Sequence, residues 1–257
     1  MSAGSNATIR IARRLARDMQ ALHFSTPSHV YNPLVYTWAA HREYLSRYGT
    51  APGRVLLLGM NPGPWGMAQT GVPFGDVAMV RDWFDIPLQL GRELPAQHRK
   101  YPILGKDCRR SEGSGARLWH WAQQRVGTPE AFFARFFVWN YCPLLFIKDA
   151  RNLVPERLGR HEGAALTQAC DRALADVWRA LRPTAVVGIG RYAQARARAV
   201  LAADVQVHYL PHPSPASPAA NRDWPGLAEA ALEPWLPPLR RTRASPAKPT
   251  PRQPPQG

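Results

Sequence analysis

The amino-acid sequence predicts an α/β fold in which helices cover both faces of a central four-stranded parallel sheet, in three αβα layers. Two observations lead to this prediction. Four short runs are rich in β-branched and aromatic residues, as buried strands are, and amphipathic segments with helical spacing lie between them. Strands joined by helical crossovers form a parallel sheet with helices on both faces.

Each predicted element follows from a local pattern. The strands are the apolar runs at residues 54–58, 136–139, 185–189 and 205–210. The helices, at residues 32–47, 115–126, 163–181 and 192–201, place apolar side chains roughly every three to four positions. Residues 224–235 predict a short final helix.

A single domain over residues 1–236, with a helical extension at residues 1–25, accounts for the apolar part of the chain. Hydrophobic residues make up 45% of the 257 residues, which suffices for a substantial core. Residues 237–257 are rich in Pro, Arg, Ser and Gln. Such a segment buries too little surface to offset the entropy of ordering, so we expect a disordered basic tail.

The charge balance indicates a polyanionic partner. The chain carries 33 Lys and Arg against 18 Asp and Glu, a net charge of +15. This favours nucleic acid over an anionic membrane surface. No apolar run approaches the roughly 20 residues of a transmembrane helix, and residues 1–21 lack the apolar region of a secretory signal. We therefore expect a soluble, intracellular monomer that binds DNA and no membrane.

The cysteines argue against a metal or redox centre. Cys108, Cys142 and Cys170 are widely separated and form no C-x-x-C pair. This spacing predicts neither a disulfide framework nor a closed metal site. We expect buried thiols, no metal and no cofactor.

Polar side chains occur where the predicted strands end, at the edge where open parallel sheets bind their ligands. Asn61 follows the first strand, Asn140 follows the second, and His212 follows the fourth, so we expect these three to converge. The first strand also leads into a Gly- and Pro-rich loop over residues 59–75. Long loops of this kind inside compact domains are usually functional, and their glycines let the backbone approach a ligand closely.

Four motifs occur in order at strand ends or helix starts. They are Gly59-Met60-Asn61-Pro62-Gly63-Pro64 with its continuation to Gly75, Ser114-Gly115-Ala116-Arg117, Asn140 with Cys142-Pro143-Leu144-Leu145-Phe146, and His212-Pro213-Ser214-Pro215. In this combination the chain resembles, over roughly residues 31–236, the single-strand-selective monofunctional uracil-DNA glycosylases of the uracil-DNA glycosylase superfamily. The resemblance implies that family's fold and an enzyme that hydrolyses the N-glycosidic bond of flipped uracil in DNA, initiating base excision repair. It leaves open whether oxidised uracil derivatives are also removed.

The resemblance also implies roles for individual residues. Asn61 would position the attacking water, His212 would donate to uracil O2, and Asn140 would read the Watson–Crick edge. The substrate-binding residues so implied are Gly59, Met60, Gly63, Met67, Phe74 and Asn140. A side-chain amide presents a donor to O4 and an acceptor to N3–H of uracil, whereas cytosine would present the reversed polarity.

DNA contacts are expected from the loop after His212, namely from Ser214, Pro215, Ala216, Ser217 and Asn221, and from Arg191 as a phosphate contact. The family commonly has Arg and Asn where this chain has Ala216 and Ser217. This departure concerns how the enzyme opens a duplex rather than what it cleaves.

Two other classes of function remain as alternatives. Residues 185–193 fit a strand followed by G-x-G-x-x-A, the fingerprint of a nucleotide-binding Rossmann-type oxidoreductase, but the next strand does not end in the required acidic residue. A non-catalytic DNA-binding module explains the charge but gives Asn61, Asn140 and His212 no task. A DNA glycosylase would act in the nucleoid-containing cytoplasm of a bacterium or in the nucleus of a eukaryote.

Overall fold

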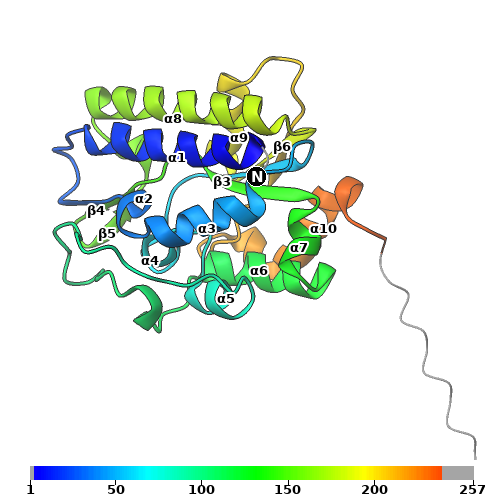
Figure 1. The fold of residues 1–257 in the computed structure, drawn as a ribbon, viewed down its shortest axis with the longest axis horizontal. Helices are drawn as coiled ribbons and strands as arrows, with labels where there is room; N and C mark the ends of the chain where they lie inside the picture. Colours follow the sequence, from blue (N-terminus) through cyan, green and yellow to red (C-terminus); the bar gives the residue numbers. More distant parts are fainter. Residues whose placement is uncertain (1–2, 239–257) are drawn as a thin grey trace, which may run out of the picture.

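The computed structural model describes residues 3–238, which fold around two sheets (Figure 1). The larger sheet is parallel, with strand order β3-β2-β6-β7. Its strands are β2 (Val55–Gly59), β3 (Phe136–Asn140), β6 (Ala185–Ile189) and β7 (Val207–Leu210). The predicted four-stranded parallel sheet is confirmed, although β7 begins two residues later than the predicted strand at 205–210.

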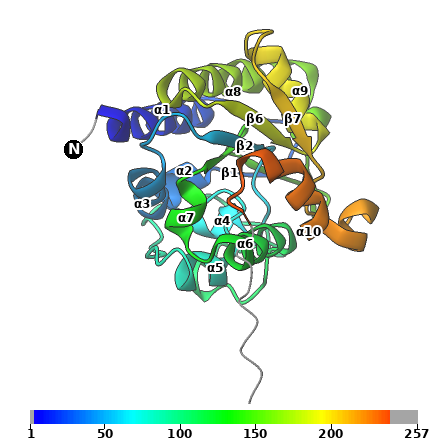
Figure 2. The ribbon, with the colours of Figure 1, turned by 90° about the vertical axis from the view of Figure 1, so that its right-hand side faces the viewer.

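Helices cover both faces of this sheet, as the predicted fold requires. On one face lie α1 (Ala3–Gln20), α8 (Arg160–Leu181) and α9 (Arg191–Val200), and Figures 1 and 2 show α1 and α8 side by side. On the other lie α4 (Met67–Thr70), α5 (Val77–Asp82), α6 (Gly113–Val126) and α10 (Pro218–Leu232). Beside β3 are α3 (Trp38–Tyr48), whose Tyr44 donates to the carbonyl of Val138, and α7 (Pro129–Phe133). Short 3₁₀ turns span Gly105–Asp107, Pro155–Arg157 and Glu233–Trp235.

The predicted N-terminal helix is present as α1, but it belongs to the core rather than extending from it. Ile11, Leu15 and Met19 recur every four residues, so they lie on one face of the helix. All three are buried, and α1 packs along α8. Within residues 3–238, no helix is both long and apolar enough to cross a membrane.

The predicted helix at residues 32–47 is interrupted. Thr37 ends α2 (Pro33–Tyr36) with non-helical backbone angles, and its hydroxyl donates to the carbonyl of Pro33. Such back-bonding bends a helix. Thr37 is also pressed against Gly71, where a Cβ would lie 2.3 Å from the Thr37 hydroxyl oxygen.

The last predicted helix, at residues 224–235, starts where the structure starts it. Asp223 has non-helical backbone angles (φ −161°, ψ 77°) and divides α10 into two helical segments. Its Oδ1 accepts from the backbone N–H of Gly226 at 2.9 Å, as the side chain of an N-cap residue does. The second segment ends at Leu232, and a 3₁₀ turn follows it.

A second, antiparallel sheet was not predicted. It consists of β1 (His29–Tyr31), β4 (Leu145–Lys148) and β5 (Arg151–Leu153), in the order β1-β4-β5. Asp149 and Ala150 connect β4 to β5 with φ of 51° and 55°, the left-handed pair typical of two-residue hairpins. Local pattern gives little indication of this turn because it lacks the usual glycine.

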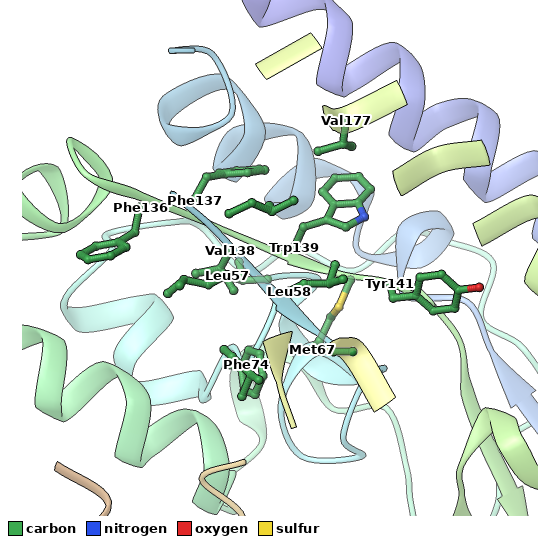
Figure 3. Packing of buried hydrophobic residues seen from close by; sticks show 14 of the residues in the cluster. Leu57, Leu58, Met67, Phe74, Phe136, Phe137, Val138, Trp139, Tyr141 and Val177 are labelled. Atoms are coloured by element: carbon green, nitrogen blue, oxygen red, sulfur yellow. The ribbon is translucent and has the colours of Figure 1, made fainter. Parts of the chain in front are cut away.

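The packing of the core determines which way the end of β3 points. Figure 3 shows Trp139 of β3 beside Val177 of α8, and Met67 and Phe74 on the opposite side of the sheet. Because successive side chains of a strand point to opposite faces, Asn140 lies on the side of Met67. The three cysteines are buried free thiols, as predicted.

Candidate active site

The carboxyl edge of the parallel sheet holds a cavity of about 330 Å³. The predicted site residues that line it are Met60, Asn61, Gly63, Met67, Phe74, Asn140, His212 and Ser214. Five separate segments of the chain contribute them: the loop after β2, helix α4, the segment around Phe74, the end of β3 and the loop after β7. The loop after β2 is not wholly irregular as expected, since α4 forms one helical turn within it.

Asn140 offers an unused acceptor to this cavity. Its side chain is 5% exposed, and its Nδ2 donates to the sulfur of Met67 at 3.2 Å. Its Oδ1 is buried and has no hydrogen-bond partner among the described residues. An unpaired buried acceptor costs stability, about 1–3 kcal/mol, so this oxygen is arranged for a donor that enters from outside the protein.

Gly59 makes room for this arrangement. A Cβ at Gly59 would lie 2.3 Å from Oδ1 of Asn140 and 2.6 Å from the ring of Phe74. No side chain can occupy that space without displacing one of them. Gly59 therefore does not line the cavity but sets the spacing of two residues that do.

Phe74 is held in a rare backbone conformation. Its φ is 54°, in the left-handed region that non-glycine residues seldom adopt. Two donors hold its carbonyl, the Trp119 indole at 2.9 Å and the backbone N–H of Asp76 at 2.8 Å. Gly115 lies directly behind, where a Cβ would lie only 1.9 Å from the same oxygen. The aromatic face is thus fixed against the cavity before any ligand arrives.

His212 is held as a neutral donor. The backbone N–H of Ser214 donates to its Nδ1 at 3.1 Å, so the neutral ring carries its proton on Nε2. Burial lowers the pKa of His212 to about 4, well below its ordinary value. Its ring centroid lies 5.9 Å from that of Phe74. At neutral pH the His212 ring is therefore uncharged and presents its Nε2–H to the cavity.

Asn61 is oriented by its amide nitrogen. Nδ2 donates to the carbonyl of Leu144 at 3.2 Å. This contact leaves Oδ1 as the part of the side chain that accepts from a ligand or water. Asn61, Asn140 and His212 converge on one cavity, as the strand topology predicted.

Four further lining residues were not among the predicted site residues: Pro64, Glu112, Ser114 and Asn152. Glu112 caps α6 by accepting from the backbone N–H groups of Ser114 and Gly115, and burial raises the pKa of its carboxyl. Glutamate is not a usual N-cap, so local pattern did not reveal it. Asn152 lies on β5, in the hairpin that no turn signal in the sequence marks.

The loop predicted to contact DNA, residues 213–221, is exposed at its tip and hydrogen-bonded at its base. Pro215 and Ala216 are exposed, while Ser217 caps α10 by accepting from the backbone of Ala220. Both ends of the Asn221 amide are used within the protein. Its Nδ2 donates to the carbonyl of Pro215 at 2.7 Å, and its Oδ1 accepts from Arg117 at 2.8 Å.

Arg191 and the glycines before it lie outside the cavity lining. The guanidinium of Arg191 lies over the Tyr209 ring, 4.9 Å from its centroid. A Cβ at Gly188 would lie 2.4 Å from the backbone nitrogen of Gln194. Gly188 therefore permits close packing of α9 on β6.

Comparison with known proteins agrees with this geometry. Residues 46–233 match the family described as the uracil DNA glycosylase superfamily. A Bos taurus protein named single-strand selective monofunctional uracil DNA glycosylase is 46% identical over 224 residues, covering 85% of this chain and 82% of its own. A Rattus norvegicus protein of the same name is 47% identical over 227 residues, covering 86% and 81%.

A solved structure shows the same fold. The crystal structure of wild-type SMUG2 from Pedobacter heparinus superposes with a TM-score of 0.60 at 16% identity, covering 87% of this chain and 97% of its own. The chain is thus a member of the uracil DNA glycosylase superfamily, within the family of the single-strand selective monofunctional enzymes.

Proposed function

We propose that this protein hydrolyses the N-glycosidic bond between uracil and deoxyribose in DNA, with Asn61 and His212 as its catalytic residues. One observation carries the proposal: Asn61, Asn140, His212 and the Phe74 ring surround a single cavity at the carboxyl edge of the sheet. Family membership supports the reaction. Family membership also supports a location with the DNA, in a bacterial nucleoid or a eukaryotic nucleus. We propose that the enzyme acts there as a monomer.

Recognition follows from the unpaired oxygen of Asn140. In this proposal uracil N3–H donates to Oδ1, and Nδ2 turns from the Met67 sulfur to O4. Cytosine has no hydrogen at N3 and an amino group at C4, so both contacts would be lost. A binding site whose polar groups all form hydrogen bonds to the substrate strongly rejects an analogue that leaves those groups without a partner. Phe74 stacks on the face of the flipped base.

Catalysis follows from the direction of charge movement. Breaking the glycosidic bond leaves negative charge on uracil and positive charge on the sugar. The Nε2–H of His212 donates to O2 as this negative charge develops, and preorganised donors of this kind stabilise the transition state more than the ground state. Asn61 Oδ1 accepts from the water that attacks the anomeric carbon.

The test uses single-turnover cleavage of a uracil-containing single-stranded oligonucleotide, with alkali to reveal abasic sites. Asn61→Ala and His212→Ala should each lower the rate by about 10²–10³, as expected for the loss of one such group, while DNA affinity stays nearly unchanged. Arg182→Ala, a substitution at the amino edge of the sheet, is the control. Wild-type cleavage rates in His212→Ala would refute the role of the histidine.

The nucleophile can be tested in the same assay. Among the described residues no lysine lines the cavity, so the proposal requires water rather than an amine that forms a Schiff base. Borohydride should therefore trap no covalent enzyme–DNA adduct. A trapped adduct would contradict the proposed mechanism.

A further inference from the structure

A basic segment borders the base cavity. Residues 105–112 run from a 3₁₀ turn to the start of α6, where Glu112 lines the cavity. Lys106, Arg109 and Arg110 are exposed, and within residues 3–238 none of them forms an ion pair. They line a second cavity of about 670 Å³ that extends to Ser111. Ser111 lines this second cavity and its chain neighbour Glu112 lines the base cavity.

Buried side chains hold this segment in place. Asp76, 3% exposed, accepts from the Ser111 hydroxyl at 2.8 Å and from the Glu112 backbone N–H at 2.9 Å. Gln69, 1% exposed, accepts from the backbone N–H groups of Leu104 and Gly105 at 2.7 and 3.1 Å. The basic side chains thus project from a backbone that is fixed at both ends.

The position of Arg110 ties the segment to the rim of the base cavity. Its guanidinium lies over the Trp65 ring, 4.6 Å from the centroid, and Trp65 follows Pro64, which lines the cavity. At the other end, Gly113 touches the loop predicted to contact DNA, because a Cβ there would lie 2.9 Å from Pro215. The segment therefore connects the Trp65 side of the rim to the loop that carries Ala216.

Nearby acidic groups do not cancel this charge. Asp82 is paired with Arg81. Asp76 already accepts from the backbone of Ala78 and Met79 as well as from Ser111 and Glu112. Glu112 accepts from the backbone N–H groups of Ser114 and Gly115, and Asp107 is an exposed carboxylate. Within the described part of the chain, none of the three basic side chains of this segment forms an ion pair with either carboxylate.

We propose that Lys106, Arg109 and Arg110 bind the phosphates of the DNA strand beside the flipped uracil. A nucleotide that enters the base cavity leaves its sugar and phosphates at the mouth, so the continuing strand must cross the rim. Proteins that hold single strands combine cationic grooves with aromatic side chains, as Arg110 and Trp65 do here. This proposal rests on the proposed function, since it assumes that the cavity receives uracil.

The first experiment measures the affinity of Arg109→Gln and Arg110→Gln for a single-stranded oligonucleotide that contains 2′-fluoro-2′-deoxyuridine. The fluorine disfavours positive charge on the sugar, so binding is measured without cleavage. Each variant should bind more weakly, and the slope of log affinity against log salt should become shallower by about 0.7 per lost phosphate contact.

The matched control is Arg182→Gln. Arg182 is exposed, forms no ion pair with any described residue, and lies just before β6, at the sheet edge opposite the cavity. Its substitution removes the same charge from the other end of the molecule. If Arg109→Gln and Arg110→Gln match Arg182→Gln in affinity and salt slope, the proposal is wrong.

The second experiment locates the contact on the DNA. Methylphosphonates replace the phosphates beside the uracil one at a time, which removes their charge. At the linkage that the protein contacts, this replacement should weaken binding by the wild type but have little further effect on binding by Arg109→Gln or Arg110→Gln. An equal loss of affinity in the wild type and in these variants would overturn the proposal. Wild-type enzyme that binds but never cleaves uracil DNA would instead refute the proposed function.

Discussion

At the scale of single residues, the missing side chain of Gly59 controls the geometry of the base cavity. Gly59→Ala would place a Cβ within 2.3 Å of the Asn140 amide oxygen, so either Asn140 or Phe74 must move. Because catalytic groups misplaced by about 1 Å lose roughly 10²-fold in rate, we expect a loss of at least this size in single-turnover cleavage.

The control for this prediction is Gly163→Ala on α8. The nearest neighbour of a Cβ there would be Leu158 at 4.0 Å, and alanine favours a helix over glycine. This variant should cleave at the wild-type rate and unfold at a slightly higher temperature. Wild-type activity in Gly59→Ala would show that the site tolerates displacement of both neighbours.

Two histidines make folding stability depend on pH. Burial lowers the pKa of His41 and of His212 to about 4, whereas in the unfolded chain both protonate near their ordinary value, about 6.5. Between these values the unfolded state binds more protons. The stabilisation is therefore complete above pH about 6.5 and is lost as the pH falls toward 4.

We predict that the free energy of unfolding, measured with urea, falls between pH 7 and pH 4.5. The slope of the free energy of unfolding against pH should be smaller in His41→Gln, because this substitution removes one titrating group. His23→Gln, a substitution of an exposed histidine, serves as the comparison. An unchanged slope in His41→Gln would show that this histidine does not carry the effect.

At the scale of elements, the loop predicted to contact DNA is held in place by α6. Arg117 donates to the Pro213 carbonyl at 3.2 Å and to the Asn221 amide at 2.8 Å. The loop that begins with His212 is thereby joined to the helix whose first turn lines the base cavity. Ala216, at the exposed tip of the loop, is too short to fill the gap that a base leaves in a duplex.

We predict that Ala216→Arg raises activity on uracil in a duplex more than on uracil in a single strand. Removing a base from a duplex costs a few kcal/mol of unstacking and unpairing, which inserted side chains partly offset. A single strand has little pairing to break. The measurement is single-turnover cleavage of both substrates, together with dissociation from abasic duplex, which should slow. Equal changes on both substrates would show that residue 216 does not act as a wedge.

At the scale of the whole molecule, positive charge is the most general feature. The predicted basic tail lies almost entirely outside the described residues, and five of the 33 Lys and Arg fall within it: Arg240, Arg241, Arg243, Lys248 and Arg252. We predict that deleting residues 239–257 weakens DNA binding and makes its salt dependence shallower, because fewer counterions are released.

Cleavage of bound substrate should not change on this deletion, because no described residue of the cavity lies beyond Ser214. Affinity measured against salt concentration and single-turnover rates separate the two effects. Unchanged affinity and salt slope would show that the tail does not contact DNA.

Local patterns in the sequence determined much of the fold and the centre of the site. The four parallel strands are short apolar runs, and their carboxyl ends must share one edge. The convergence of Asn61, Asn140 and His212 therefore follows from the order of strands and helices along the chain. The DNA-contact roles of Ser214, Ala216 and Arg191 stay predictions.

Only the tertiary structure decided the features that depend on contacts between distant segments. The Thr37 hydroxyl lies against Gly71, and Asn152 reaches the cavity through a hairpin without a glycine turn. Glu112 enters the site through an N-cap of unusual type, and the Asn221 amide is occupied by Arg117, 104 positions away in the chain. Sequence periodicity reports which face of an element is buried, whereas these contacts depend on how the elements pack together.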